Sequence, residues 1–187
     1  MTSRTTEAVT SRAQLGRRRR KHSLLTPAET AHYEAIVRRY TERLVQMLDV
    51  IFLDRELAAD AAQDAFVQLY LHFGEVGGSP EPEAWIYRVA VNRGKDYKRQ
   101  LMRRARLLRR LAGAPPPSYA SGGTVDDDFT RILRRLPLKQ RTAAALFYQA
   151  DLSISEIGRI MDISEGAVNS HLSRARQTLK GMLEARR

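Results

Sequence analysis

The chain has 187 residues, of which 32 are Lys or Arg and 21 are Asp or Glu, so its formal net charge is +11. A hydrophobic content of 43% allows one or two compact domains with real cores, which excludes a wholly disordered protein. No run approaches the roughly 18 uninterrupted apolar residues of a membrane span, so we expect no membrane insertion. The lack of cysteine excludes disulfide frameworks, thiolate metal sites and cysteine nucleophiles, and favours the reducing cytoplasm.

The positive charge is unevenly distributed along the chain. Residues 85–112 carry a net +9 and residues 129–187 a net +6, whereas residues 23–84 carry −7. Clustered Lys and Arg neutralise phosphates, so two basic stretches separated by acidic sequence indicate two surfaces for a polyanion and one for another partner. A merely solvated charged surface is the alternative that composition leaves open.

The segments that follow one another along the chain predict an all-α fold of two helical domains joined by a flexible linker. Residues 1–25 lack apolar periodicity and predict a disordered basic arm. Residues 26–111 form the first predicted domain, in which order begins near Thr26. Residues 112–128 are rich in Pro, Gly and Asp and predict the linker. Residues 129–187 form the second, smaller helical domain.

Three helices are expected in the first domain. In the first of these, apolar residues recur at intervals of three and four from Tyr33 onward. The second spans about 56–73, and a Gly- and Pro-rich breaker loop over 74–82 ends it. The third spans 83 to about 111. No period-two strand pattern is visible in the sequence.

The second predicted helix has an acidic face. At roughly 100° per residue, Asp60, Gln63 and Asp64 gather on one side, opposite a row of Ala, Leu and Phe residues. An acidic face is a poor DNA binder, so it is suited to docking on a basic protein surface or to simple solvation.

The third predicted helix has a basic stripe formed by Arg88, Asn92, Lys95 and Arg99. Three cations and one amide at helical spacing are typical of a surface that follows a phosphate backbone and reads bases. Nearby aromatic rings, Trp85 and Tyr87, are the kind of group on which unstacked bases stack. A tryptophan at the start of an apolar helix is more often a core residue, and we expect Trp85 in the core.

The second domain has the pattern of a helix-turn-helix. Ser153 and Glu156 form a predicted capping box for one short helix, and Ser164 is a good N-cap for the last helix. The outward residues of that last helix include Asn and Arg, which pair bidentately with adenine and guanine in the major groove. The candidate reading residues are Asn169, Ser170, Ser173, Arg174 and Arg176. An ordinary helical hairpin with a solvated face has the same spacing.

Residues 60–66 (DAAQDAF) and 84–92 (AWIYRVAVN) resemble region 2 of the bacterial sigma factors of the sigma-70 family. Residues 136–137 (LP), 155–158 (SEIG) and 166–176 (GAVNSHLSRAR) resemble region 4. Possession of these two regions alone, joined by a linker, is similar to the extracytoplasmic-function (ECF) subfamily.

This resemblance implies an alternative sigma factor with no catalytic activity and no cofactor, whose partners are core RNA polymerase and promoter DNA. Asp60, Gln63 and Asp64 would dock on the β′ clamp helices, and region 4 would meet the β flap. Arg88, Asn92, Lys95 and Arg99 would melt and read the minus-ten element. The five residues of the last helix would read the minus-thirty-five element. An anti-sigma factor is a further partner that the resemblance admits.

Two other classes of function are alternatives. A stand-alone helix-turn-helix regulator would share the second domain but would leave the acidic face of the first unexplained. An enzyme is disfavoured, because no carboxylate pair, nucleophile or phosphate-binding loop is organised for chemistry.

Overall fold

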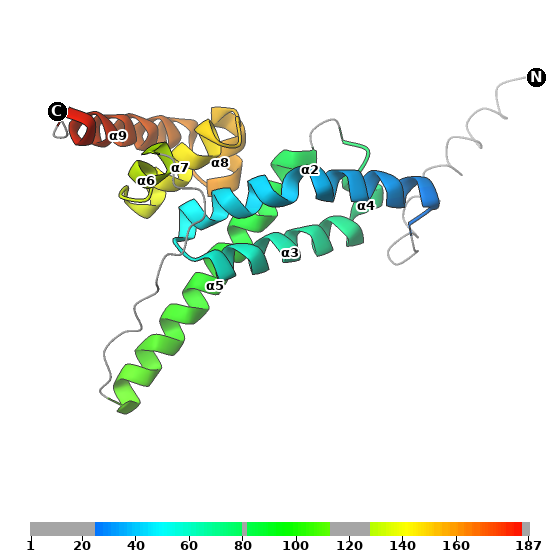
Figure 1. The fold of residues 1–187 in the computed structure, drawn as a ribbon, viewed down its shortest axis with the longest axis horizontal. Helices are drawn as coiled ribbons and strands as arrows, with labels where there is room; N and C mark the ends of the chain where they lie inside the picture. Colours follow the sequence, from blue (N-terminus) through cyan, green and yellow to red (C-terminus); the bar gives the residue numbers. More distant parts are fainter. Residues whose placement is uncertain (1–24, 80–81, 113–127, 185–187) are drawn as a thin grey trace, which may run out of the picture.

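The computed structural model describes residues 25–79, 82–112 and 128–184. All regular elements in these three ranges are α-helices, which confirms the expected fold class (Figure 1). The predicted basic arm lies outside these residues except for Leu25, and the predicted linker lies outside them except for its two end residues. Within the same ranges, no helix is long and apolar enough to cross a membrane.

The N-terminal helices are α2 (Pro27–Phe52), α3 (Arg55–Leu71), α4 (Phe73–Val76) and α5 (Pro82–Ala112). A capping box starts α2: the Glu29 backbone N–H donates to the Thr26 hydroxyl, while the Glu29 carboxylate accepts from the Thr26 backbone N–H. The helix ends where Leu53 turns into the left-handed region, with φ 57°. Asp54 then caps α3 through the Leu57 N–H, at 3.0 Å.

The predicted breaker loop contains one turn of helix, α4, so the expectation of a loop throughout 74–82 was wrong at its start. Phe73 is buried there and fixes the turn against the core. Gly77 is required beside it, because a Cβ at this position would lie 2.6 Å from the Phe73 ring. A four-residue helix is too short to give a periodic pattern, which explains why the sequence did not reveal it.

Helix α5 is the longest element and carries much of the chain's basic charge. Its first half buries Ile86, Tyr87, Ala90 and Val91 against α2 and α3. Beyond residue 98 most of its side chains are exposed, and this second half projects away from the other helices (Figure 1).

The C-terminal helices are α6 (Asp128–Leu133), α7 (Leu138–Tyr148), α8 (Ile154–Met161) and α9 (Glu165–Glu184). The predicted capping box of α8 is confirmed, with Ser153 N–H to the Glu156 carboxylate at 2.8 Å and Glu156 N–H to the Ser153 hydroxyl at 3.3 Å. The turn between α8 and α9 passes through Asp162, in the left-handed region, and the Ser164 hydroxyl accepts from Ala167 N–H at 3.2 Å. Helices α8 and α9 therefore form the expected helix-turn-helix.

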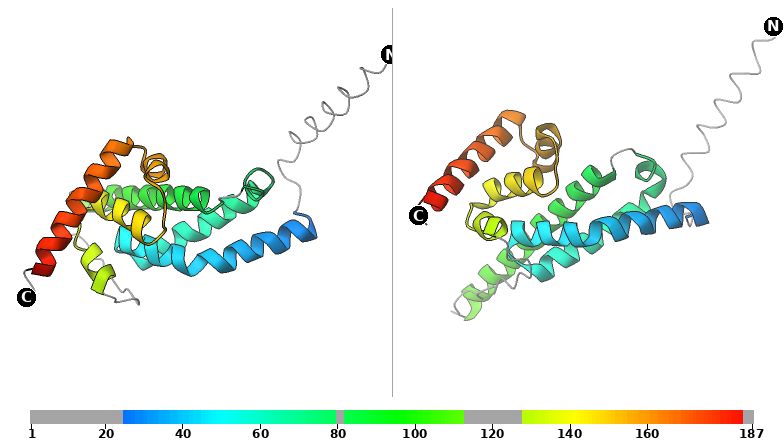
Figure 2. Two further views of the ribbon diagram at one scale, coloured as in Figure 1. Left: turned by 90° about the horizontal axis from the view of Figure 1, so that it is seen from above. Right: turned by 45° about the horizontal axis from the view of Figure 1, so that its top comes forward.

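The two groups of helices pack against each other, which the sequence did not predict. Helix α2 contacts α7, and α5 contacts α8, so the C-terminal helices lie across one end of the N-terminal ones (Figure 2). Both groups contribute to one continuous cluster of buried apolar residues.

Candidate nucleic-acid and protein interfaces

The acidic face of α3 is positioned by the apolar residues on its other side. Ala61, Ala65, Phe66 and Leu69 are buried against the core, as the periodicity predicted. Asp60 and Gln63 are consequently turned to solvent.

Asp64 lies at the edge of this face and is partly engaged within the protein. Its carboxylate accepts a 2.7 Å hydrogen bond from the Tyr97 hydroxyl and lies 3.7 Å from the Arg93 guanidinium. The hydrogen bond to Asp64, with burial and the nearby carboxylates, raises the pKa of Tyr97 above its usual value. Asp64 therefore joins α3 to α5, while Asp60 and Gln63 form the freely exposed part of the face.

The basic stripe of α5 is largely exposed, in agreement with the prediction that its residues share one outer face of the helix. Arg88, Asn92 and Arg99 are exposed, and Arg99 forms an ion pair with Asp96 one turn earlier. Lys95 is half-buried, because α8 covers its side chain.

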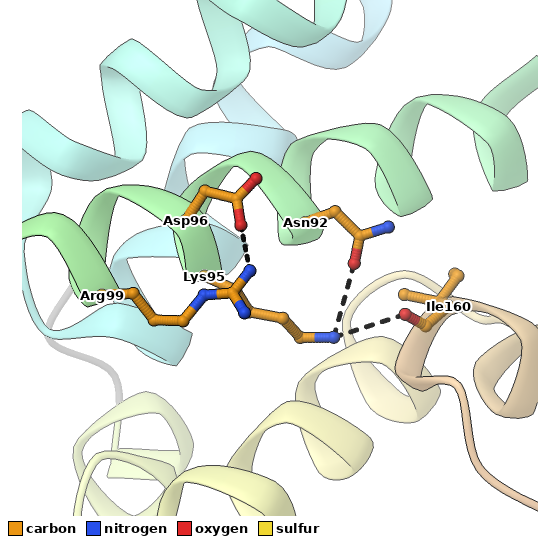
Figure 3. A network of polar contacts seen from close by, with 5 residues as sticks. All are labelled: Asn92, Lys95, Asp96, Arg99 and Ile160. Carbon is orange, nitrogen blue, oxygen red and sulfur yellow. Dashed lines mark hydrogen bonds and ion pairs between the residues drawn. The ribbon is translucent and has the colours of Figure 1, made fainter.

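Figure 3 shows how Lys95 is held. Its ammonium donates to the backbone carbonyl of Ile160 at 3.4 Å and to the Asn92 side-chain oxygen at 3.5 Å. Burial is the largest influence on its pKa, which lies below the usual lysine value. Ile160 is in the last turn of α8, where carbonyls have no partner within the helix, so Lys95 acts as a cationic cap supplied by α5.

The two aromatic residues near the stripe have different surroundings. Tyr87 is only 2% exposed, so it is a core residue and offers no surface for base stacking. Trp85 packs against the core, as expected, but stays partly exposed, with its ring centroid 6.0 Å from that of His72. Only Trp85 of this pair has a ring that a base could reach.

The outer face of α9 is opposite a buried row formed by Val168, Leu172 and Ala175. All five candidate reading residues, Asn169, Ser170, Ser173, Arg174 and Arg176, are exposed. Between them, His171 is half-buried, and burial together with the positive charges of Lys139 and Arg174 lowers its pKa. The neighbouring Arg174 supplies an exposed cation on this part of the face.

Arg176 also stabilises the helix packing. Its Nε donates to the Tyr148 hydroxyl at 2.9 Å, and its guanidinium lies 5.9 Å from the centre of the Phe147 ring. These contacts fix the end of α7 against α9.

A set of polar residues that the sequence analysis did not single out joins the two groups of helices. Arg134 Nη2 lies 2.6 Å from the carboxylate of Asp49, which is 3% exposed. Arg43 donates two hydrogen bonds, at 3.0 and 2.8 Å, to the Gln149 carbonyl. Arg141 is buried and donates to the Ile51 carbonyl at 3.0 Å. The partners are 85 to 106 residues apart, so no local spacing could have revealed them.

Two parts of the chain match two regions of the sigma-70 family, in the expected order. Residues 32–104 match sigma-70 region 2, and residues 126–179 match sigma-70, region 4. The first range covers the acidic face of α3 and the basic stripe of α5, and the second covers the helix-turn-helix.

Curated relatives are similar over most of their length. The ECF RNA polymerase sigma factor SigM of Bacillus subtilis is 29% identical over 153 residues, which cover 80% of this chain and 93% of the relative. SigM of Mycobacterium tuberculosis strain H37Rv is 26% identical over 181 residues, which cover 90% of this chain and 87% of the relative.

Among solved structures, the sigma factor RpoE of Bartonella quintana, in complex with the anti-sigma factor NepR, has a TM-score of 0.61 at 22% identity. The match covers 83% of this chain and 98% of that one. CnrH, in complex with the cytosolic domain of CnrY, has a TM-score of 0.54 at 23% identity. This match covers 82% of this chain and 88% of that one. These similarities agree in fold with the family matches, and the chain belongs to the ECF subfamily of the sigma-70 family of RNA polymerase sigma factors.

Proposed function

We propose that this alternative sigma factor binds core RNA polymerase through α3, melts and reads the minus-ten promoter element through α5, and reads the minus-thirty-five element through α9. The observation that carries the proposal is the exposure of one acidic and two basic or polar faces on three different helices of one chain. A stand-alone DNA-binding regulator would need only the last of these faces.

Docking on the polymerase is assigned to Asp60 and Gln63, with Asp64 at the edge of the surface. The exposed carboxylate and amide supply acceptors for the cations of the β′ clamp helices. Because Asp64 is bonded to Tyr97, it also positions α3 relative to α5. Docking through α3 would thus be coupled to the helix that reads DNA.

Minus-ten recognition is assigned to the α5 stripe. Arg88, Lys95 and Arg99 supply cations for phosphates, and the exposed Asn92 amide can pair with the edge of an unstacked base. Trp85 offers a partly exposed ring beside them. Unstacking a base costs a few kcal/mol, which a row of preformed contacts can offset.

Minus-thirty-five recognition is assigned to the exposed face of α9. Asn169 and Arg174 are the base-reading candidates, and Ser170, Ser173 and Arg176 supply further donors in the major groove. The C-terminal helices are also proposed to meet the β flap. The structural neighbour RpoE, which is in complex with the anti-sigma factor NepR, supports an anti-sigma factor as a further partner.

The docking assignment is tested by measuring binding of purified core polymerase to the wild-type chain and to Asp60→Lys. We expect at least a tenfold loss of affinity, about 1.4 kcal/mol, because the substitution places like charges together. Glu34→Lys makes the same change of charge at an exposed position of α2 and is the control. Equal affinity of Asp60→Lys and Glu34→Lys would remove α3 from the interface.

A further inference from the structure

One row of side chains on α5 begins against α3 and ends in solvent. Its members recur at intervals of four and three residues and are Tyr97, Leu101, Arg104, Leu108 and Leu111. At the start of the row, the Tyr97 hydroxyl donates to Asp64 of α3 at 2.7 Å, and Tyr97 and Leu101 both pack against the core. The row is therefore on the side of α5 that faces α3.

The helices that cover this side of α5 end before the row does. Lys98 donates to the carbonyl of Phe52 at the end of α2, where the chain turns into α3, and the second half of α5 projects beyond this point (Figure 1). Here Leu107 is 57% exposed, Leu108 54% and Leu111 76%, the largest fraction for any large apolar side chain in the described ranges. These three leucines form a patch on one projecting helix, which we call the leucine patch.

The charge around the leucine patch is positive throughout. After Asp96, α5 contains seven Lys or Arg residues and no acidic residue. Arg104 is on the same side of the helix as the patch, one turn before Leu108. A second copy of this chain would bring a patch of equal charge against this one, which is unfavourable. A fitting partner consequently has apolar groups flanked by negative charge.

The position of the patch distinguishes among negatively charged partners. Arg88, Asn92 and Arg99 of the minus-ten stripe project from the other side of α5, so DNA bound there leaves the leucines uncovered. A bilayer surface is flat, and α3 lies on the same side of α5 as the patch, so α3 would meet such a surface first. A single helix is about 10 Å wide and can lie along the patch beyond the start of α3.

We propose that the leucine patch binds an acidic amphipathic helix of a partner protein. Apolar residues of that helix at intervals of three and four pack on Leu108 and Leu111, and its carboxylates pair with Arg104 and the neighbouring cations. The length of α5 from residue 99 to residue 112 is about 20 Å, which accommodates about four turns of a partner helix. The inference goes beyond the proposed function and does not depend on it, because the patch lies outside its three surfaces.

A synthetic helical peptide of about 16 residues is the probe, with Leu at every third or fourth position and Glu on both sides of this row. Its fluorescence anisotropy measures binding to the full chain. We expect saturable binding by the wild-type chain and at least tenfold weaker binding by Leu108→Gln with Leu111→Gln. No saturable binding by the wild-type chain, or equal binding of a peptide with the same composition in shuffled order, would overturn the proposal.

The matched control for the leucines is Val67→Gln with Leu71→Gln on α3. These side chains are 47% and 50% exposed, so the control also removes two exposed apolar groups. Its affinity for the peptide should equal that of the wild-type chain. An equal loss in both double variants would show that the peptide binds any exposed apolar group, which would remove the assignment to the leucine patch. Circular dichroism verifies that both double variants are folded.

The contribution of charge is tested on the same helix. Arg104→Gln removes a cation from the side of the patch and should weaken peptide binding by about threefold. Arg106→Gln removes an equally exposed cation from the opposite side of α5 and should have a smaller effect. Equal effects of the two substitutions would reduce the interaction to general attraction between opposite charges and would contradict the proposed position of the partner helix.

Two further measurements distinguish other partners of the same patch. Cosedimentation with phosphatidylglycerol vesicles that is lost in Leu108→Gln with Leu111→Gln, without peptide binding by the wild-type chain, would assign the patch to a membrane surface. A dimer in sedimentation velocity that dissociates in the same variant would assign it to a second copy of the chain. Either result would overturn the proposal, and neither measurement requires polymerase or promoter DNA.

Discussion

Single side chains determine where α8 and α9 begin. Ser153 and Glu156 satisfy each other's backbone N–H groups at the start of α8, and the Ser164 hydroxyl accepts from the first turn of α9. These caps define the first turns of the two helices of the helix-turn-helix. Asp162, with φ 57°, completes the turn in a conformation that aspartate tolerates better than most residues.

Ser153→Ala is expected to lower the free energy of unfolding by about 1 kcal/mol, because the Glu156 N–H in the first turn of α8 loses its acceptor. Urea unfolding followed by circular dichroism measures the difference. Ser155→Ala, two residues further along and exposed, is the matched control and should change stability by less than about 0.5 kcal/mol. Equal effects of the two substitutions would contradict the capping role.

At the scale of elements, a close crossing positions the basic stripe. Gly94 is buried where α5 passes the end of α2, and a Cβ there would lie 2.2 Å from an atom of the Phe52 ring. The neighbouring Lys98 donates to the Phe52 carbonyl at 3.1 Å. The absence of a side chain at residue 94 thus allows α5 to approach the end of α2 closely.

Gly94→Ala is expected to destabilise the protein by about 1–3 kcal/mol, because the added methyl group overpacks the crossing. The higher helix propensity of Ala offsets up to about 1 kcal/mol of this loss. Gly181→Ala, in α9, has nothing within 4 Å of the added Cβ and should stabilise by up to about 1 kcal/mol. Thermal unfolding of both variants gives the comparison. A Gly94→Ala protein as stable as Gly181→Ala would show that the crossing is not tight.

The sequence predicted the elements better than their packing. Periodicity and caps located the long helices and the helix-turn-helix, because these signals are local. Helices α4 and α6 are too short for a periodic pattern. The sequence offers Tyr87, together with Trp85, as an aromatic ring near the stripe on which bases could stack, whereas the structure buries Tyr87 in the core, in line with its i, i+4 spacing with Val91. The contacts of Arg43 and Asp49 with the C-terminal helices join distant parts of the chain and leave no local signal.

At the scale of the whole molecule, the net charge of +11 is divided among surfaces of opposite sign. The acidic α3 face and the basic second half of α5 lie on neighbouring helices, which Asp64 and Arg93 join by an ion pair. This separation allows one chain to meet a basic protein surface and a polyanion at the same time. Residues 1–22, which carry a net +6, lie outside the described residues and add a further basic segment.

Deleting residues 1–21 is expected to flatten the dependence of DNA affinity on salt, because each lost phosphate contact lowers the slope of log K against log salt by about 0.9. Binding to a promoter duplex between about 50 and 200 mM salt measures this slope. As a control for net charge, Arg39→Ala removes one exposed cation from α2. An unchanged slope after deletion would show that the basic segment makes no phosphate contact.

Run-off transcription with purified core polymerase tests the central claim most directly. With genomic DNA fragments as templates and the transcript ends mapped, the account predicts that the wild-type chain directs initiation from defined start sites. Asp60→Lys should abolish these transcripts, and Glu34→Lys should retain them. No promoter-dependent stimulation on any fragment, or full stimulation by Asp60→Lys, would contradict the account.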